Sequence, residues 1–184
     1  MKRFVDRGAI TAAYVGIGMA ITVAISFLLV IPIEPIVWLL ALPSGLLIGY
    51  YANQRSGRGA GPWRRLLGNA LFAGIVTGLT MALLLLGVKA LFFFADNGYR
   101  DPGLGGQITC SSGPECVYLR YLDLGRGPDL VAAGVTDVES FTSFYWSQQA
   151  QAAGLILVLT TIGSAGGAVI YGVTRPKRTA PAAA

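Results

Sequence analysis

Residues 66–95 read LLGNALFAGIVTGLTMALLLLGVKALFFFA, a long stretch in which Lys89 is the only charged side chain. The hydrocarbon core of a bilayer is about 30 Å thick, and a helix rising about 1.5 Å per residue crosses it with about 20 apolar residues. This stretch is long enough to do so, and so are residues 9–31, 33–52 and 149–173. The sequence therefore predicts an all-α integral membrane protein with four transmembrane helices.

Composition agrees with lipid as the main solvent of the chain. Hydrophobic residues make up 54% of the sequence and charged residues only 12%, whereas a soluble domain carries about 25% charged residues. Little remains outside the four spans beyond a short N-terminus, a linker over residues 53–65, a loop over 96–148 and a tail over 174–184. We expect one membrane domain over residues 1–184 with a small appendage.

The positive charges lie on one side of this predicted topology. Lysines and arginines gather in the N-terminus, the linker and the tail: Lys2, Arg3, Arg7, Arg55, Arg58, Arg64, Arg65, Arg175, Lys177 and Arg178. The positive-inside rule places all three regions in the cytoplasm and the loop 96–148 outside. This placement accounts for the net charge of +5 without a nucleic-acid partner.

The first span is expected to remain in the protein. Its apolar run is longer than that of a secretory signal, and no small-residue cleavage site follows Val30. The richness in Gly, Ala and Arg fits a bacterial cell, so we expect a multi-pass protein of the inner (cytoplasmic) membrane.

Pro43 predicts a kink in the second span, because it removes a backbone donor and clashes with a preceding carbonyl.

Small residues recur every four positions along the spans, which places them on one helix face and allows helices to approach closely. The predicted packing positions are Gly8, Ala12, Gly16, Ala20, Ala24, Gly45, Gly49, Gly74, Gly78, Gly163 and Gly167. Two interpretations are open. The faces pack against one another inside a four-helix bundle, or one of them docks onto another membrane protein.

Two charged residues lie in or beside the spans. Lys89 is near the outer end of the third span, where its long stem reaches the interface by snorkelling. The other interpretation is that it pairs with Glu34 or with a carboxylate of a partner, because charges inside the membrane are costly and often functional. Glu34 itself begins the second span, where a carboxylate interacts favourably with the helix dipole.

Cys110 and Cys116 are the only two cysteines, and both lie in the predicted external loop. An even count in an oxidising compartment predicts a disulfide, which is the reading that best fits this spacing. The flanking segments 107–109 and 117–122 carry β-favouring residues around a Gly-Pro turn, so we expect the bond to staple a small β-hairpin.

A further helix is predicted at the end of the loop. Thr136 and Glu139 match a T-x-x-E capping box, so a helix should start near Asp137. It either lies on the outer membrane surface or continues directly into the fourth span as one long rod.

No arrangement of reactive groups in the sequence indicates an enzyme. The chain has no histidine, which excludes haem–histidine ligation and Ser-His triads from this subunit, and we expect no metal and no cofactor. The preferred hypothesis is a non-catalytic accessory or scaffold subunit that contacts membrane lipids and associates with other membrane protein subunits, or with itself, through its small-residue faces and outer loop. The alternative is a small transporter or channel, indicated by Pro43, Lys89 and the hydroxyls of the third and fourth spans.

Overall fold

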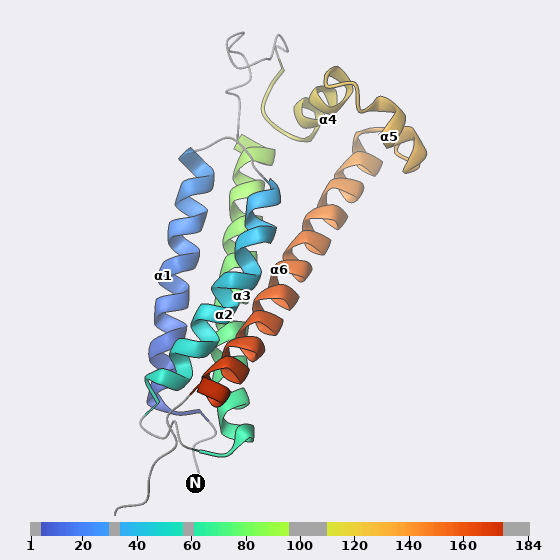
Figure 1. Cartoon of the computed structure of the whole chain (residues 1–184). Helices are drawn as coiled ribbons and strands as arrows, with labels where there is room; N and C mark the ends of the chain where they lie inside the picture. The colour runs from blue at the N-terminus through green and yellow to red at the C-terminus, as the bar shows by residue number, and fades with distance from the viewer. Residues whose placement is uncertain (1–4, 30–33, 57–60, 96–109, 175–184) are drawn as a thin grey trace, which may run out of the picture. The chain divides into compact units, whose positions relative to one another are not determined.

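The computed structural model describes residues 5–29, 34–56, 61–95 and 110–174, except for the side chains of residues 26–29 and 34–38. These residues form six helices (Figure 1): α1 (Arg7–Leu29), α2 (Glu34–Gln54), α3 (Trp63–Ala95), α4 (Pro114–Asp123), α5 (Gly127–Ala132) and α6 (Val138–Thr174). No strand is present in this described part of the chain, so the predicted all-α class is confirmed for it.

Three of the described helices are long and apolar enough to cross a membrane. They are α1, over Arg7–Ile25, and the whole of α3 and α6. The length and composition of these helices suggest a multi-pass membrane protein. In α2 the described side chains begin only at Leu39, which leaves a shorter apolar stretch than a span requires. The second predicted span, residues 33–52, is helix α2 in the structure, and its membrane crossing stays a prediction.

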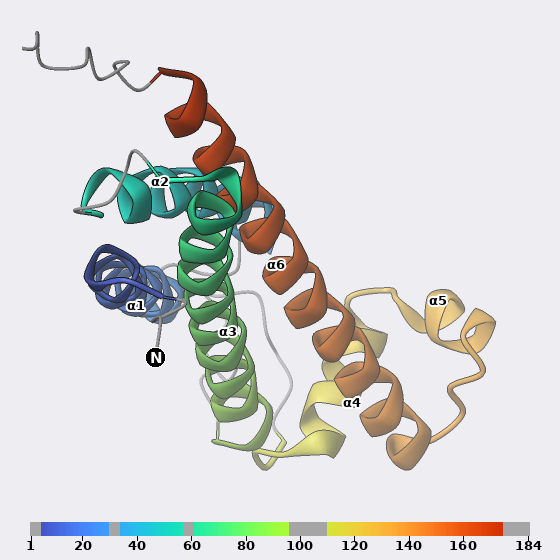
Figure 2. The ribbon, with the colours of Figure 1, turned by 90° about the horizontal axis from the view of Figure 1, so that it is seen from below.

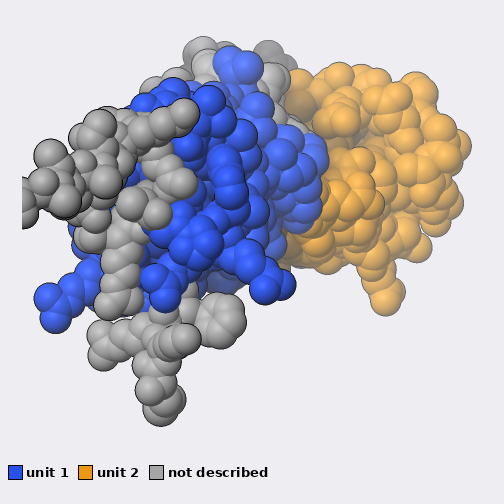
Figure 3. Space-filling model, turned by 60° about the horizontal axis from the view of Figure 1, so that its bottom comes forward, with its two compact units in different colours: residues 1–84, 154–184 blue, residues 85–153 orange. Residues whose placement is uncertain are grey.

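Contacts between residues divide the chain into two compact units, coloured separately in Figure 3. Unit 1 comprises residues 1–84 and 154–184, and unit 2 comprises residues 85–153. Helices α3 and α6 each contribute one end to each unit. Each unit has packing of its own, and the two differ in the size of the side chains that build it.

Unit 1 consists of α1, α2, the first part of α3 and the last part of α6 (Figure 2). Its core is made of small residues, with Ala12, Ala52 and Ala73 gathered around Ile48. Side chains this small allow helix axes to approach closely, which is how helices gain packing energy in lipid. Helix α2 continues through Pro43, the position at which a kink was predicted.

Unit 2 consists of the end of α3, the short helices α4 and α5, and the start of α6. Its core is large and aromatic, with Phe93 and Phe141 almost fully buried. Both short helices end in a glycine of positive φ, Gly125 at φ 73° and Gly134 at φ 77°. Such a glycine closes a helix by letting the following N–H bond back to a carbonyl of the last turn. The N–H groups of residues 126 and 135 do so, at 3.0 and 2.9 Å.

The predicted β-hairpin is wrong where it can be compared with the structure. Residues 117–122 lie inside helix α4, and residues 107–109 are outside the described part of the chain. Pro114 occupies the first turn of α4, where a missing N–H costs nothing, and Glu115 beside it favours a helix start. These signals, with the aromatic core to pack against, outweigh the β preference of the side chains.

The predicted loop over residues 96–148 contains α4, α5 and the first part of α6. The predicted helix start near Asp137 is correct, and α6 runs unbroken from Val138 to Thr174, which selects the single long rod. The capping pair lies one residue later than predicted: the Ser140 N–H donates to Asp137 Oδ1 at 2.8 Å, and the Asp137 N–H donates to Ser140 Oγ at 3.1 Å. Thr136 and Glu139 are therefore not the capping box.

Candidate functional site

Helices α2 and α6 meet through glycines on both sides. A Cβ atom placed on Gly45 or Gly49 would lie closer than 3.0 Å to backbone atoms of α6, and one on Gly163 or Gly167 would lie equally close to backbone atoms of α2. The two pairs therefore bring the two main chains into direct contact. Any side chain at these positions would have to separate the helices.

Helix α1 uses its small-residue face in the same way. Gly8, Ala12, Gly16 and Ala20 are buried, and Ala24 is half-buried. A Cβ atom on the first glycine would collide with the backbone at the end of α2, and one on the second with a threonine of α3. The face lies against other helices of unit 1.

Helix α3 completes this packing through Gly74 and Gly78, which face Ser164 and Leu157 of α6. All eight glycines that the four-residue spacing singled out thus meet atoms of a neighbouring helix of the same chain. These faces are used within unit 1, so a partner that docks on unit 1 needs another surface.

The hydroxyl groups that suggested a solute path belong mostly to helix packing. Thr77, Thr80, Thr161 and Ser164 each donate to a backbone carbonyl of their own helix, at 2.7–2.9 Å. Thr160 is fully buried, and its Oγ1 has no hydrogen-bond partner among the described residues. Four of the five hydroxyls are therefore already satisfied by the helix backbone.

Lys89 is half-buried and lies six residues before the end of α3, at Ala95. Glu34 is the first residue of α2, and its side chain lies outside the described part of the chain. Snorkelling and pairing therefore both stay predictions for Lys89.

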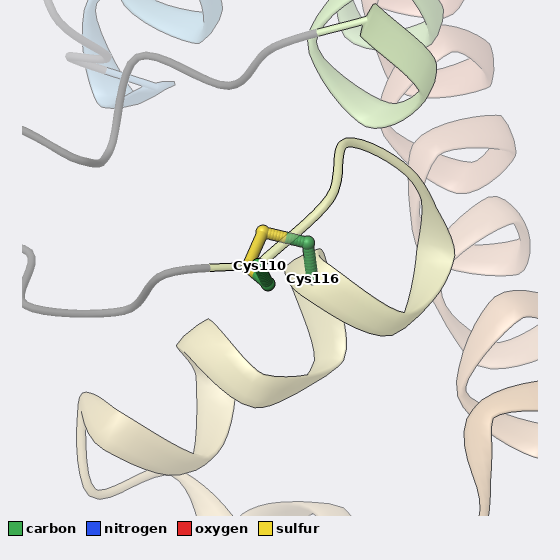
Figure 4. Close-up of a disulfide and its surroundings, with 2 residues drawn as sticks. All are labelled: Cys110 and Cys116. Carbon is green, nitrogen blue, oxygen red and sulfur yellow. A yellow bond between two sulfur atoms is a disulfide. The ribbon is translucent and has the colours of Figure 1, made fainter.

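The predicted disulfide is confirmed: Cys110 and Cys116 are bonded, with their Cα atoms 5.3 Å apart (Figure 4). Cys116 lies in the first turn of α4 and is buried. The bond ties the segment before α4 to that helix. Closing this short loop adds to the stability that the aromatic core gives so small a unit.

The α4–α5 region leaves apolar side chains exposed. We call them the apolar patch of unit 2, and they are Leu119, Leu122, Leu124 and Val131. Leu124 and Val131 are the most open, at 70% and 73% of their full exposure. Leu124 and Val131 lie near Gly125 and Gly134, the glycines that close α4 and α5. The aromatic core does not cover these side chains. Sequence reasoning did not single them out.

Acidic side chains surround this patch in the sequence, and all are exposed: Glu115, Asp123, Asp129, Asp137 and Glu139. Among the basic residues of unit 2, Arg126 lies 3.8 Å from the Asp129 carboxylate and stacks on the ring of Tyr121 at 4.8 Å. The described part of unit 2 thus combines exposed aliphatic groups with a negative surface.

A cluster of buried polar residues, which we call the polar junction, was not predicted. Asp6 Oδ2 accepts hydrogen bonds from Ser56 Oγ and from Asn69 Nδ2, the latter at 3.1 Å. Asn53 Nδ2 donates to the carbonyls of Gly49 and Leu66 at 3.1 and 3.0 Å. These bonds join the starts of α1 and α3 to the end of α2.

The polar junction also caps α1. Asp6 Oδ1 accepts from the N–H groups of Gly8 and Ala9, at 2.9 and 3.2 Å. Burial raises the pKa of Asp6, but the hydrogen bonds from Ser56, Ala9, Asn69 and Gly8 together leave the pKa below its ordinary value. The position of Asp6 just before the first apolar run is a helix-start signal that could have found the cap. Its partners 50 and 63 residues away give no local signal.

Comparisons with known proteins add no family. A scan against protein-family models and searches of curated proteins and of solved structures find no match. Within the described part of the chain, no group of three or more Cys, Asp or Glu side chains is placed to hold a metal ion.

Proposed function

We propose that the protein is a non-catalytic accessory or scaffold subunit of a membrane complex, and that unit 2 carries the contact with its partner. One observation carries this proposal: unit 2 has a closed aromatic core of its own, yet keeps Leu122, Leu124 and Val131 open. We infer that these side chains, which lie close together along the chain, form one surface, and exposed apolar surface of this kind on a folded protein is typical of binding sites. The small-residue faces, by contrast, already have neighbours inside unit 1.

The charge of unit 2 specifies the chemistry of the partner. Its five described carboxylates are exposed, while Arg126 is held by Asp129 and Tyr121. A protein surface that presents aliphatic or aromatic side chains rimmed by Lys and Arg would match both the apolar patch and the negative field. Complementary charge of this kind accelerates association and selects among partners.

The proposal includes a location. Arginines and lysines in the N-terminus, linker and tail favour a cytoplasmic position for both ends of the chain in the inner membrane of a bacterial cell, which leaves unit 2 outside. A disulfide in unit 2 supports the same orientation, because disulfides persist in oxidising compartments.

A photo-crosslinking residue introduced at Leu124 in native membranes tests the proposal. We expect a discrete adduct whose yield falls several-fold at high salt and in the double variant Asp123→Asn/Asp129→Asn. The same crosslinker at Ala132, which is exposed but not part of the apolar patch, is the matched control. Equal yields at both positions, or no adduct at Leu124, would count against partner binding through unit 2.

A small transporter or channel is the second candidate function. Its specific support is Thr160, whose buried Oγ1 has no hydrogen-bond partner among the described residues; Asn53 Oδ1 is a second buried unpaired atom of unit 1. A pathway through unit 1 would need further groups of this kind. Solute flux into liposomes that disappears in Lys89→Ala or Thr160→Val would favour this function over the accessory role.

A further inference from the structure

One end of unit 1 carries four exposed arginines: Arg7, Arg55, Arg64 and Arg65. They come from the first residue of α1, the residue after α2, and the first turn of α3. The sequence separates them by up to 58 positions, so only the fold can bring them to a common surface. We call this surface the arginine end of unit 1.

The hydrogen bonds of the polar junction bring the helix ends that carry these arginines together. Asp6, next to Arg7, accepts a hydrogen bond from Ser56, next to Arg55. It also bonds to Asn69, one turn beyond Arg65. These helix ends meet in the lower part of Figure 1.

Carboxylates leave this charge largely uncompensated. Asp6 is the only carboxylate among the described side chains of unit 1. Both of its oxygens accept hydrogen bonds from neutral donors, two N–H groups on one and Ser56 and Asn69 on the other. Its hydrogen-bonding capacity is therefore spent inside the junction, and the arginine end has a positive field.

Aromatic rings lie beside the arginines. Trp63 precedes Arg64 directly, is 45% exposed, and packs against the backbone position of Gly172 on α6. Tyr51 lies under the Arg55 guanidinium at 5.5 Å, and its hydroxyl accepts from Arg55 Nε at 3.1 Å. Rings with one polar edge are typical of the depth at which lipid headgroups meet hydrocarbon.

We propose that the arginine end of unit 1 binds the phosphates of anionic phospholipid headgroups. Arg7, Arg64 and Arg65 lie at the starts of helices long enough to cross a bilayer, so they lie at the level of the phosphates when those helices are embedded, and the polar junction holds Arg55 at the same end. Arginine donates to phosphate through a planar fork of N–H groups, and each basic residue near an anionic surface gains about 1 kcal/mol, or about fivefold in affinity. Trp63 and Tyr51 orient these side chains against the bilayer.

Fluorescence of Trp63 provides a direct test. The variant Trp38→Phe/Trp146→Phe keeps Trp63 as the only tryptophan, and it is placed in bilayers that contain brominated phosphatidylglycerol or brominated phosphatidylcholine at equal mole fraction. We expect stronger quenching by brominated phosphatidylglycerol than by brominated phosphatidylcholine. Each of the variants Arg55→Gln, Arg64→Gln and Arg65→Gln should lower the affinity for phosphatidylglycerol relative to phosphatidylcholine about fivefold. Arg126→Gln, an exposed arginine of unit 2, is the matched control and should leave the preference unchanged.

Two measurements distinguish the lipid from other ligands and do not depend on the variants. The thermal stability of the unaltered protein should be higher in phosphatidylglycerol nanodiscs than in phosphatidylcholine nanodiscs, and raised salt should remove the difference. Inorganic phosphate or a short RNA added to phosphatidylcholine nanodiscs should not reproduce the effect. Equal quenching by both brominated lipids, equal stability in both nanodiscs, or full reproduction by phosphate or RNA would each overturn the proposal.

Discussion

Units 1 and 2 reach a packed core by opposite means. In unit 1 the residues between the helices are glycine and alanine, and main chains touch at Gly45, Gly49 and Gly167. In unit 2 the core is built from rings such as Phe93, which lies 4.6 Å from Tyr145 between ring centres. This difference is expected if lipid surrounds unit 1 and water surrounds unit 2. Lipid offers little hydrophobic drive between helices, so close approach matters there, whereas in water the burial of large rings is stabilising.

The comparison also separates packing from binding. Unit 1 uses its small-residue faces internally and leaves aliphatic side chains such as Leu83 and Ile162 outside, where hydrocarbon satisfies them. If unit 2 lies in water, its exposed Leu124 and Val131 have no hydrocarbon around them. Exposed aliphatic side chains there indicate a binding surface and not contact with lipid. Four predictions test this contrast.

The largest effect is expected in the aromatic core. Phe93→Ala should destabilise unit 2 by about 3–5 kcal/mol, because a fully buried ring is lost and a cavity remains. Limited proteolysis of the α4–α5 segment reports this loss. Phe92→Ala changes the neighbouring residue, which is 38% exposed, and should have much less effect. Similar protection of both variants would show that unit 2 does not depend on its rings.

The matched test in unit 1 compares two adjacent glycines of α6. Gly167→Ala should destabilise the helix packing by about 2–3 kcal/mol, because the new methyl group collides with the backbone of α2. Gly166→Ala adds the same group where no described atom lies within 4 Å, and should be neutral or slightly stabilising. Thermal denaturation in detergent measures both. If the two variants melt alike, close backbone approach is not what holds unit 1 together.

Much of the fold could be predicted from local signals. Length without charge predicted the helices, four-residue spacing predicted the glycine positions that lie between them, and two cysteines in one loop predicted the disulfide. Each of these patterns lies within a short stretch of chain. The tertiary structure adds no competing preference at those positions, so the local signal and the fold agree.

The errors lie where several local signals compete. In residues 117–122 the β-favouring side chains conflicted with Pro114 and Glu115 at a helix start. The helix forms because it buries Val117 in the aromatic core of unit 2. Polar residues brought together from distant positions, as at Asp6 and Asn69, leave no periodic pattern. The exposure of the apolar patch of unit 2 could not be predicted either, because the sequence does not show which face of a short helix is covered.

The disulfide should matter to one unit only. Cys110→Ser/Cys116→Ser is expected to destabilise unit 2 by about 2 kcal/mol, the amount that the closure of so short a loop contributes in chain-entropy estimates. Proteolysis between α4 and α6 should accelerate accordingly, while the melting of unit 1 stays constant. If removing the disulfide lowered the stability of both units equally, the two units would unfold together. The contrast between them would then hold for how they pack and not for how stable each one is.

The smallest effect concerns pH and again separates the units. The pKa of Asp6 is below the ordinary value of 3.8 in the folded protein, since its hydrogen bonds outweigh the cost of burial. The ionised form therefore contributes stability above about pH 4, and this contribution disappears as the pH falls through the lowered pKa. Asp6→Asn should remove this acid dependence from unit 1, measured as the melting temperature between pH 6 and pH 3.

Asp137 supplies the counterpart in unit 2. Its pKa is lowered by the Ser140 N–H and hydroxyl at the start of α6, so Asp137→Asn should remove acid dependence from unit 2 and leave that of unit 1 intact. Asp6 joins three helix ends, whereas Asp137 caps one exposed turn, so acid should loosen unit 1 more than unit 2. If Asp137→Asn removed more of the acid dependence of the melting temperature than Asp6→Asn does, the role given to the polar junction would be contradicted.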